Sequence, residues 1–521
     1  MPPRMPESRT VPELVAELAR RYPDREALIG GGIRWHFADV AAEVSRLAAA
    51  FRKIGVAPGG RVGILMGNRP EWVPCAFAAM HLGASVVGLN TWLTAPELAY
   101  QLAHAQVRWL VVQARFAGRD LLALTEATGV PLDRVIVVDG PAEGADRIAY
   151  AAFHALGDGP PPAPAARPAD PGFILYTSGS TARPKCVPLQ HFALIENMWH
   201  IGERQHLTPD DRLWLAVSLF WSLGCVNALF AAWTHGSAIV LQERFDAGEA
   251  LALIEREGCT AVYATPNMAL ALWEHPDRPR RDLSSLRTGV TIGTPEQVQR
   301  LVDLGAREIC NVYGLTEVYG NCAVTDAHDP LARRLAANGR PLPGVTIRIV
   351  DPATRMPLPD GETGEILVRG YVTPGYLDGP DVNAAAFTAD GWFVTGDLGL
   401  IDDAGQVRFR GRLKEMIKTG GINLAPAEVE AVLCRHPGVE TAFVIGLPDA
   451  RRDEVVAAVI VPRDEAAPPD EAALQAHCRA NLAAYKVPRR LRVIPGRDLP
   501  LTTTGKIQRS RLAELFVRPH A

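Results

Sequence analysis

Apolar residues recur along the chain in two alternating patterns. Val11, Leu14, Val15 and Leu18 follow helical spacing, which predicts an amphipathic helix near the N-terminus. Short apolar runs bounded by glycine and proline come afterwards, and each predicts a buried strand: VGILM at 62–66, WLVV at 109–112, VIVV at 135–138 and FILY at 173–176. This alternation of helices and strands predicts an α/β fold in which helices cover layered sheets.

Two longer apolar regions, 72–92 and 217–241, approach the length of a membrane span. Both carry polar residues within or near their centres, among them Asn90, Asn227 and His235. An unpaired polar group in lipid costs about 2 to 3 kcal/mol, so we interpret both regions as buried core. Residues 157–172 are rich in proline, alanine and glycine and predict a surface connection before the strand at 173–176.

The pattern changes toward the C-terminus. After residue 345, VTIRIVD, EILVRG and QVRFRGR predict a β-rich subdomain. After Arg412, two helical and several strand segments predict a small α+β domain of about one hundred residues. The expected architecture is therefore a large N-terminal domain at 1–411, built of layered α/β subdomains and a β-rich subdomain, followed by a small domain at 412–521.

Composition narrows the functional classes. A chain of 521 residues exceeds what one core usually organises. The net charge of -4 provides no basic excess, so nucleic acid is not an expected partner. The eight cysteines are scattered singly, without C-x-x-C pairs, which argues against a structural zinc site built on cysteine. No apolar leader precedes the first helix, and together with the dispersed cysteines this favours a cytoplasmic protein without a membrane span.

The most informative segment is YTSGSTARPK, from Tyr176 to Lys185. Backbone N–H groups of a tight turn, small hydroxyls and a lysine together suit a phosphate-binding loop, although taken alone the stretch could be an ordinary Ser/Thr-rich surface loop. The pattern of a Walker loop is absent. The residues expected to contact ATP phosphates are Thr177, Ser178, Gly179, Ser180, Thr181 and Lys185.

Four further motifs follow in order: NVYGLTE at 311–317, GWFVTGD at 391–397, GRLKEMIKTGG at 411–421 and TTGK at 503–506. With the loop at 176–185, they resemble the signature motifs of the adenylate-forming superfamily, which contains acyl-CoA synthetases, carrier-protein adenylation domains and luciferases. The resemblance spans nearly the whole chain and is closest to the acyl-CoA ligases. It implies that ATP activates an acid as an acyl-AMP with release of pyrophosphate.

The resemblance assigns roles that the residue types can perform. Tyr313 would stack on the purine and Gly314 would allow close backbone approach. Thr316 would contact the α-phosphate, and Glu317 would hold Mg²⁺, a hard cation suited to carboxylate oxygen. Asp397 would accept the ribose hydroxyls, with Arg412 as a forked donor. Further ATP contacts are implied at Gly293, Thr294, Pro295 and Asn311.

Three positions of the small domain complete this assignment. Lys506 would be the catalytic lysine, since its charge offsets the repulsion between the substrate carboxylate and the α-phosphate. Lys414 matches the hinge about which the small domain turns between two half-reactions. Gly420 and Gly421 match the segment along which the thiol arm of CoA passes.

The sequence departs from the family pattern at three positions. Ala182 and Cys186 stand where glycine is usual, and we expect Cys186 to be a packed residue and not a nucleophile. Trp221 stands where the family often has histidine, near the acyl pocket. The expected pocket residues are Trp221, Asn227, Tyr319 and Gly320, with Gly293 and Asn321 beside them. This set favours a short, medium or aromatic acid over a long fatty chain.

We therefore expect an ATP- and Mg²⁺-dependent acyl-CoA ligase with CoA as co-substrate. Other acceptors or acids stay open: a carrier-protein thiol, an amine, or nitrite activated for diazotisation in a biosynthetic pathway. An alternative of another class is a non-catalytic nucleotide-binding protein, which only Ala182 and Cys186 suggest.

Overall fold

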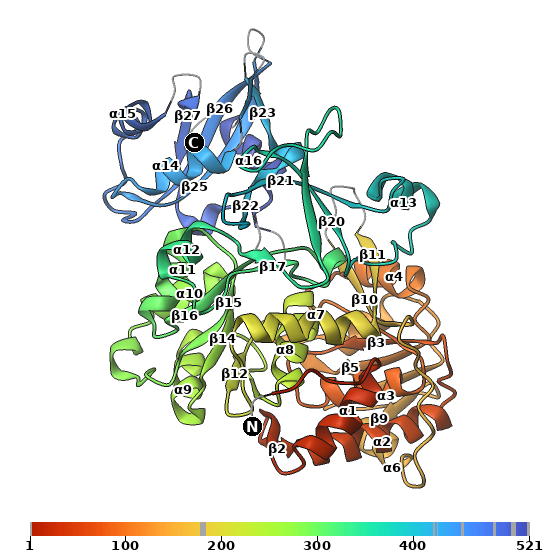
Figure 1. Cartoon of the computed structure of the whole chain (residues 1–521). Coiled ribbons are helices and arrows are strands. Elements are labelled where there is room, and N and C mark those ends of the chain that lie inside the picture. The colour runs from red at the N-terminus through yellow and green to blue at the C-terminus, as the bar shows by residue number, and fades with distance from the viewer. Residues whose placement is uncertain are drawn as a thin grey trace. The chain divides into compact units, whose positions relative to one another are not determined.

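The computed structural model describes the chain except residues 1–2, 178–183, 420–421, 425, 450–452, 483–485, 502–506 and 518–521. The chain divides into two compact units (Figure 1). The large unit comprises 1–347 and 368–393, and the small unit comprises 348–367 and 394–521. The β-rich segment after residue 345 therefore contributes to both units. A mobile lid that begins at 412 stays a prediction.

A seven-stranded sheet forms the first layer of the large unit, in the order β11-β10-β4-β3-β5-β8-β9. All its neighbours pair in parallel except β10 and β11, which form an antiparallel pair. The strands are β3 (Arg61–Leu65), β4 (Ser85–Gly88), β5 (Trp109–Gln113), β8 (Arg134–Val138), β9 (Arg147–Ala149), β10 (Pro171–Thr177) and β11 (Lys185–Gln190). Four of these strands contain the apolar runs that predicted them.

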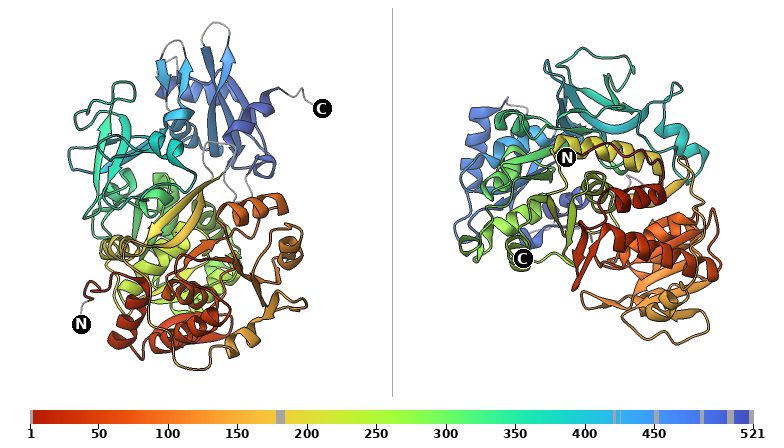
Figure 2. Two further views of the ribbon diagram at one scale, coloured as in Figure 1. Left: turned by 90° about the vertical axis from the view of Figure 1, so that its right-hand side faces the viewer. Right: turned by 60° about the horizontal axis from the view of Figure 1, so that its bottom comes forward.

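Helices cover this sheet, and the helices of the N-terminal region lie together in both views of Figure 2. The Thr10 side chain and Glu13 form a capping box at the start of α1, the helix that the apolar spacing predicted. Leu110 and Val112 of β5 pack with residues of α4 and α5. The helices are α1 (Val11–Arg21), α2 (Phe37–Lys53), α3 (Trp72–His81), α4 (Ala95–His104), α5 (Leu121–Glu126) and α6 (Tyr150–Ala155); β6 (Arg115–Phe116) and β7 (Arg119–Asp120) form a short hairpin.

A nine-stranded sheet forms the second layer, in the order β18-β17-β16-β15-β14-β12-β13-β1-β2. Its strands are β1 (Glu26–Gly30), β2 (Ile33–His36), β12 (Arg212–Leu215), β13 (Ala238–Leu241), β14 (Ala261–Ala264), β15 (Thr288–Thr291), β16 (Glu308–Tyr313), β17 (Ala323–Val324) and β18 (Arg340–Pro341). The associated helices are α7 (His191–Arg204), η1 (Ser222–Ala228, a π-helix), α8 (Leu229–Thr234), α9 (Ala247–Glu257), α10 (Pro266–Glu274), η2 (Arg278–Arg280), α11 (Pro295–Asp303), η3 (Thr316–Val318) and α12 (Leu331–Ala336). A further helix of the large unit, α13 (Pro380–Ala386), lies later in the chain.

The two long apolar regions pack against each other in the core. The ring of Phe77 lies 5.6 Å from the rings of both Phe230 and Trp233, measured between centroids. All three side chains are buried, and each such burial stabilises the fold by about 2 to 3 kcal/mol. Among the described residues, no helix is long and apolar enough to cross a membrane.

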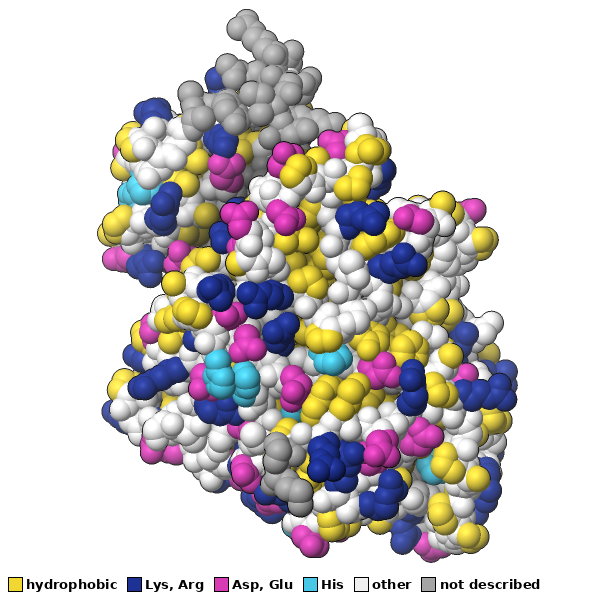
Figure 3. All heavy atoms as spheres, in the orientation of Figure 1, with side chains coloured by type: hydrophobic (Ala, Val, Ile, Leu, Met, Phe, Trp, Pro, Cys, Tyr) yellow, Lys and Arg dark blue, Asp and Glu magenta, His cyan; other side chains and the backbone are white. Residues whose placement is uncertain are grey.

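A four-stranded sheet of β19-β20-β21-β22 confirms the predicted β-rich segment. The last part of the chain pairs β24-β23-β26-β25, with β27 beside β26. The strands are β19 (Thr346–Val350), β20 (Gly364–Arg369), β21 (Phe393–Ile401), β22 (Val407–Arg412), β23 (Ile417–Thr419), β24 (Ile422–Leu424), β25 (Val439–Asp449), β26 (Asp453–Pro462) and β27 (Arg490–Val493); the helices are η4 (Leu413–Glu415), α14 (Pro426–Cys434), α15 (Glu471–Asn481), η6 (Gly496–Asp498), α16 (Arg509–Leu512) and η7 (Ala513–Phe516). On the face drawn in Figure 3, basic and acidic side chains are intermixed.

Candidate functional site

The predicted phosphate loop connects β10 to β11. Thr177 ends β10 and pairs with Lys185, the first residue of β11, so the two ends of the loop lie side by side. The Thr177 hydroxyl is buried and has no hydrogen-bond partner within the part of the chain that the structure describes. Ser178, Gly179, Ser180, Thr181 and Ala182 lie outside that part.

Lys185 belongs to a compact cluster with Tyr376 and Glu317. The Lys185 ammonium lies 4.6 Å from the centroid of the Tyr376 ring, within the range of a cation–π contact. The Tyr376 hydroxyl donates a 2.7 Å hydrogen bond to Oε1 of Glu317. Burial, and then the charge of Glu317, raise the pKa of Tyr376, which keeps the phenol protonated as a donor. The side chain of Glu317 is 7% exposed, and its backbone carbonyl accepts a bond of 2.7 Å from the Thr373 amide.

Two hydrogen bonds to the backbone of Cys186 hold the segment of Tyr376 beside Lys185. The Leu377 amide donates to the Cys186 carbonyl at 3.0 Å, and the Cys186 amide donates to Oδ2 of Asp378 at 2.8 Å. The Cys186 thiol points into the apolar core beneath the sheet, and burial raises its pKa to about 12. Cys186 is therefore a packed residue, as expected, and its backbone positions the neighbouring lysine.

Thr316 begins η3 directly before Glu317. Its hydroxyl lies 3.4 Å from the hydroxyl of Ser222, the first residue of the π-helix η1. The carbonyl of Trp221 accepts hydrogen bonds from the amides of Gly224 and Cys225 at 2.9 Å. Trp221 directly precedes Ser222, whose hydroxyl contacts that of Thr316.

Trp221 belongs to an aromatic group with Trp92 and Phe220. The centroid of its ring lies 5.2 Å from that of Trp92 and 5.5 Å from that of Phe220. Trp221 and Trp92 are both partly exposed. Together they form an aromatic surface, whereas a tryptophan of the hydrophobic core would be fully buried.

A buried amide network centres on Asn227. Asn227 donates to the Tyr319 carbonyl at 2.7 Å and accepts from Nδ2 of Asn321 at 2.5 Å. Tyr319 has φ 59°, a left-handed conformation, and its hydroxyl accepts the Gln190 amide at 2.9 Å. A Cβ on Gly320, where φ is 89°, would lie 2.5 Å from Nδ2 of Asn227. This network fixes the turn after η3, and Asn227 acts in it as an anchor.

Gly314 lies against the same turn, since a Cβ there would meet the Gly320 carbonyl oxygen at 2.1 Å. Asn311 and Tyr313, on the same strand, are both buried. Nδ2 of the Asn311 side chain donates to the carbonyl of Ala337 at 3.1 Å and, more weakly, to that of Gly293 at 3.5 Å. Asn311 therefore ties neighbouring loops to β16, and stacking of a purine on Tyr313 stays a prediction.

Thr294 is the N-cap of α11, and Pro295 is its first residue. The side chain of Gln297 accepts the Thr294 amide at 3.0 Å. A Cβ on Gly293 would lie 2.7 Å from the same Gln297 oxygen. The segment 293–295 therefore packs closely against Gln297 at the N-terminus of α11.

In the small unit, Asp397 of β21 lies directly opposite Arg412 of β22. Arg412 Nε approaches Oδ1 of Asp397 at 3.2 Å, and Asp397 is buried whereas Arg412 is partly exposed. Lys414 lies in η4, immediately after β22. Lys506, Gly420 and Gly421 lie outside the described residues, so their roles stay predictions.

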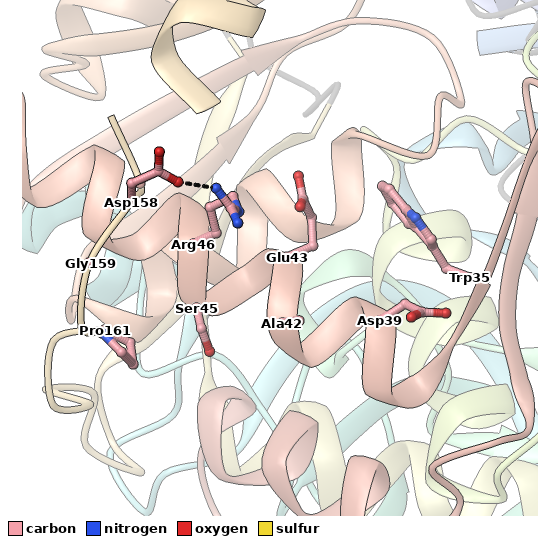
Figure 4. A pocket seen from close by; sticks show the side chains of 10 residues that line it. Trp35, Asp39, Ala42, Glu43, Ser45, Arg46, Asp158, Gly159 and Pro161 are labelled. Carbon is pink, nitrogen blue, oxygen red and sulfur yellow. Dashed lines mark hydrogen bonds and ion pairs between the residues drawn. The ribbon is translucent and has the colours of Figure 1, made fainter. Parts of the chain in front are cut away.

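A cavity of about 460 Å³ opens along α2. Figure 4 shows Asp39, Glu43 and Arg46 of α2 beside it, with Asp158 paired to Arg46. None of the motif residues that the structure describes lines this cavity, so it is separate from the described part of the predicted adenylation site.

Comparison with protein families matches residues 15–377 to the AMP-binding enzyme model and residues 428–506 to the AMP-binding enzyme C-terminal domain. The chain belongs to the AMP-binding enzyme family. Two curated relatives match this AMP-binding enzyme over almost its full length. A CoA ligase of Mycobacterium tuberculosis, named for a methyl-dioxo-octahydro-indenyl propanoyl group, is 36% identical over 97% of this chain and 99% of the relative. Feruloyl-CoA synthase of Amycolatopsis sp is 35% identical over 96% of this chain and 97% of the relative.

Solved structures of other enzymes are similar to this chain over almost its full length. The anthranilate CoA ligase AuaEII in complex with anthranoyl-AMP superposes with a TM-score of 0.87 at 28% identity, covering 98% of this chain and 99% of that one. The amide bond synthetase McbA from Marinactinospora thermotolerans superposes with a TM-score of 0.85 at 29% identity, covering 97% and 100%. The expected fold class is confirmed, and the AMP-binding enzyme is an ATP-dependent ligase of the adenylate-forming type.

The structure brings together Thr177, Lys185, Thr316 and Glu317, which sequence motifs had indicated separately. It also adds Tyr376, Ser222 and Asp378, which sequence reasoning missed. Tyr376 lies 59 positions from Glu317, in a V-T-P-G-Y stretch that matches none of the motifs found in the sequence. Local pattern carries no signal for such a pairing.

Proposed function

We propose that this AMP-binding enzyme activates a compact aromatic or cyclic carboxylic acid as its acyl-AMP and transfers the acyl group to CoA. The observation that carries the proposal is the Lys185–Tyr376–Glu317 cluster, which lies at the base of the phosphate loop and next to Thr316. Cationic, hydroxyl and carboxylate groups converge there, as the transfer of an anionic phosphoryl group between anionic reactants requires. The compartment we propose for this reaction is the cytoplasm.

The same cluster suits the proposed cofactor. Glu317 is a buried carboxylate fixed by Tyr376, and such an oxygen fits Mg²⁺, which binds through one or two carboxylates and substrate phosphates. When bound, the ion would neutralise phosphate charge. The side chains of this chain would supply the other contacts. Thr177 would offer to phosphate oxygen its hydroxyl, which has no partner among the described residues, Lys185 would supply positive charge, and Lys506 would bridge the carboxylate and the α-phosphate.

We also propose roles for residues of the small unit. Asp397 would accept the ribose hydroxyls beside Arg412, which already faces it. Lys414 would be the hinge at the start of the lid, 412–521, and Gly420 and Gly421 would line the path of the CoA arm. The relatives whose names specify CoA ligase activity favour CoA as acceptor.

ATP–pyrophosphate exchange tests the proposal. Exchange stimulated by an aromatic acid, followed by AMP release and thioester formation only with CoA, would support it. Exchange without consumption of CoA would favour another acceptor, such as a carrier-protein thiol, nitrite or an amine; McbA, by its name, forms amide bonds. No exchange across a broad panel of acids would refute adenylation of a carboxylic acid and favour non-catalytic nucleotide binding.

The aromatic surface at Trp221 supports a planar or cyclic acid. Because Trp221 adjoins the Ser222–Thr316 contact, its indole would meet the part of the substrate near the carboxylate. Flat rings pack well on indole, and the names of feruloyl-CoA synthase and the anthranilate CoA ligase specify aromatic acids.

Replacing Trp221 with alanine should lower kcat/KM for an aromatic acid about tenfold relative to a short aliphatic acid. A lost aromatic contact is worth about 0.5 to 1.5 kcal/mol beyond its buried area. KM for ATP should stay unchanged. Trp273→Ala is the matched control, because Trp273 contacts Arg278 outside this group. Equal loss with both acids would argue that Trp221 does not face the substrate.

A further inference from the structure

Two histidines and an aspartate from distant parts of the large unit meet at its surface. His206 follows α7, whereas Asp326 and His328 follow β17. Each residue offers a ligand atom, and these atoms lie within 4.8 Å of one another. None of the three belongs to the adenylation motifs.

The group is held in place by its surroundings. His206 Nε2 donates to Oδ1 of Asp326 at 2.9 Å, and the same oxygen accepts the His328 amide at 2.9 Å. The two imidazole rings are stacked, with centroids 3.7 Å apart and planes 13° from parallel. The Ala327 amide donates to the carbonyl of Arg204 at the end of α7, at 2.8 Å. The backbone on both sides is therefore fixed, and His328 is exposed enough for its ring to turn.

We propose that His206, Asp326 and His328 form a binding site for a divalent transition-metal ion, with Zn²⁺ as the best match. Two imidazoles and one carboxylate with an open fourth position are a recurrent Zn²⁺ ligand set. Nitrogen ligands disfavour Mg²⁺ and Ca²⁺, which prefer oxygen. The site is independent of the ligase activity.

Binding requires a small local change. Ligand atoms around tetrahedral Zn²⁺ lie roughly 3.3 Å apart. His206 Nε2 and Oδ1 of Asp326, now 2.9 Å apart, must therefore separate slightly. Ligand atoms that now lie up to 4.8 Å apart must approach by about 1.5 Å at most. His206 Nε2 gives up its proton, directed at present to Asp326, and the rings open from the stack as exposed His328 rotates. Water takes the fourth position, since Glu308, 4.0 Å from His328 Nε2, is held at 2.7 Å by Arg287.

Both positively and negatively charged side chains surround the proposed metal site. Arg204 lies 3.7 Å from Oδ2 of Asp326, and Arg287 donates to the His206 carbonyl at 3.1 Å. These cations oppose a metal ion, and Asp326 and Glu308 offset them. We therefore expect moderate affinity, with a dissociation constant in the micromolar range.

The bound ion would join the end of α7 to the strand pair β16–β17. Thr325, next to Asp326, accepts the Asn311 amide at 2.9 Å, so the same loop supports the strand that carries Asn311 and Tyr313. The expected result of binding is a more stable large unit.

Calorimetric titration of the full-length chain, free of any polyhistidine tag and of nucleotide, with ZnCl₂ tests the site. We expect one Zn²⁺ per chain and a rise in Tm of about 3 °C at a hundredfold excess over Kd. His328→Ala should weaken binding about 10- to 100-fold and abolish the rise in Tm. His206→Asn should have the same effect, because it removes the imidazole ligand. Asparagine is chosen here because it tolerates the left-handed backbone of His206 (φ 51°).

His436→Ala is the matched control. His436 forms a second ring pair with His477, with centroids 5.3 Å apart, and its loss should leave Zn²⁺ binding unchanged. The proposal is overturned if wild type and His328→Ala bind Zn²⁺ with the same affinity and stoichiometry, if His436→Ala alone abolishes binding, or if wild type binds no Zn²⁺ at micromolar concentrations.

Discussion

Replacing Lys506 with alanine is expected to lower the rate of acyl-AMP formation about 10²- to 10³-fold. The substrate carboxylate and the α-phosphate are both anions, and a lysine that bridges them offsets their repulsion in a site shielded from water. Loss of one such group commonly costs about 3 to 4 kcal/mol of transition-state stabilisation. Single-turnover formation of acyl-AMP measures this effect directly.

The second half-reaction provides the internal comparison. If the lid alternates between two positions, Lys506 serves only adenylation, and the variant should convert supplied acyl-AMP and CoA to thioester at the wild-type rate. Lys486→Ala, which removes a lysine paired with Glu428 in the same unit, should leave both rates nearly unchanged. Equal slowing of both half-reactions in the Lys506 variant would contradict domain alternation.

Replacing Glu317 with glutamine is expected to slow adenylation about 10²-fold and to raise the Mg²⁺ concentration needed for half-maximal rate. The substitution keeps the size of the side chain and an oxygen for the Tyr376 hydroxyl, but it removes the negative charge that suits a hard cation. A Mg²⁺ titration of initial rates at saturating ATP separates weaker metal binding from a general loss of activity.

Glu196→Gln is the matched control for this change. Glu196 accepts the Tyr371 hydroxyl at 3.0 Å, a similar contact outside the cluster at Lys185, and its replacement should not alter the Mg²⁺ requirement. Should Glu317→Gln lower the rate at every Mg²⁺ concentration by one constant factor, Glu317 would position Tyr376 and not hold the ion.

Part of this site was predictable from local sequence. The apolar run at 173–176 predicted the strand that leads into the loop, and the small hydroxyls, glycine and lysine of the loop indicated phosphate binding. Thr316 and Glu317 were indicated only by the NVYGLTE motif, through the resemblance to the adenylate-forming superfamily. The pairing of Thr177 with Lys185 was not predicted, because it depends on β11 turning back beside β10.

The departures from the family pattern were harder to interpret from sequence. Cys186 is packed in an apolar core, as expected, but the sequence did not indicate that its backbone also holds Leu377 and Asp378. Trp221, expected as a pocket residue, is partly exposed beside Trp92, which supports the proposal that its indole faces the substrate. Asn227, expected as a pocket residue, fixes the turn at Tyr319 and Gly320 through hydrogen bonds, and its place in the pocket stays a prediction.

Local patterns in the sequence were sufficient for the α/β class, the first helix, four strands of the first sheet and the buried character of 72–92 and 217–241, because each depends on residues close together in the chain. The ordered motifs were sufficient for the adenylate-forming family. The partners of those residues depend on the packed fold. Tyr376 reaches Glu317, Asn227 meets Gly320, and His206 meets Asp326 only when sheets and helices bring together segments about 60 to 120 positions apart. No local periodicity records such contacts, since they arise from tertiary packing.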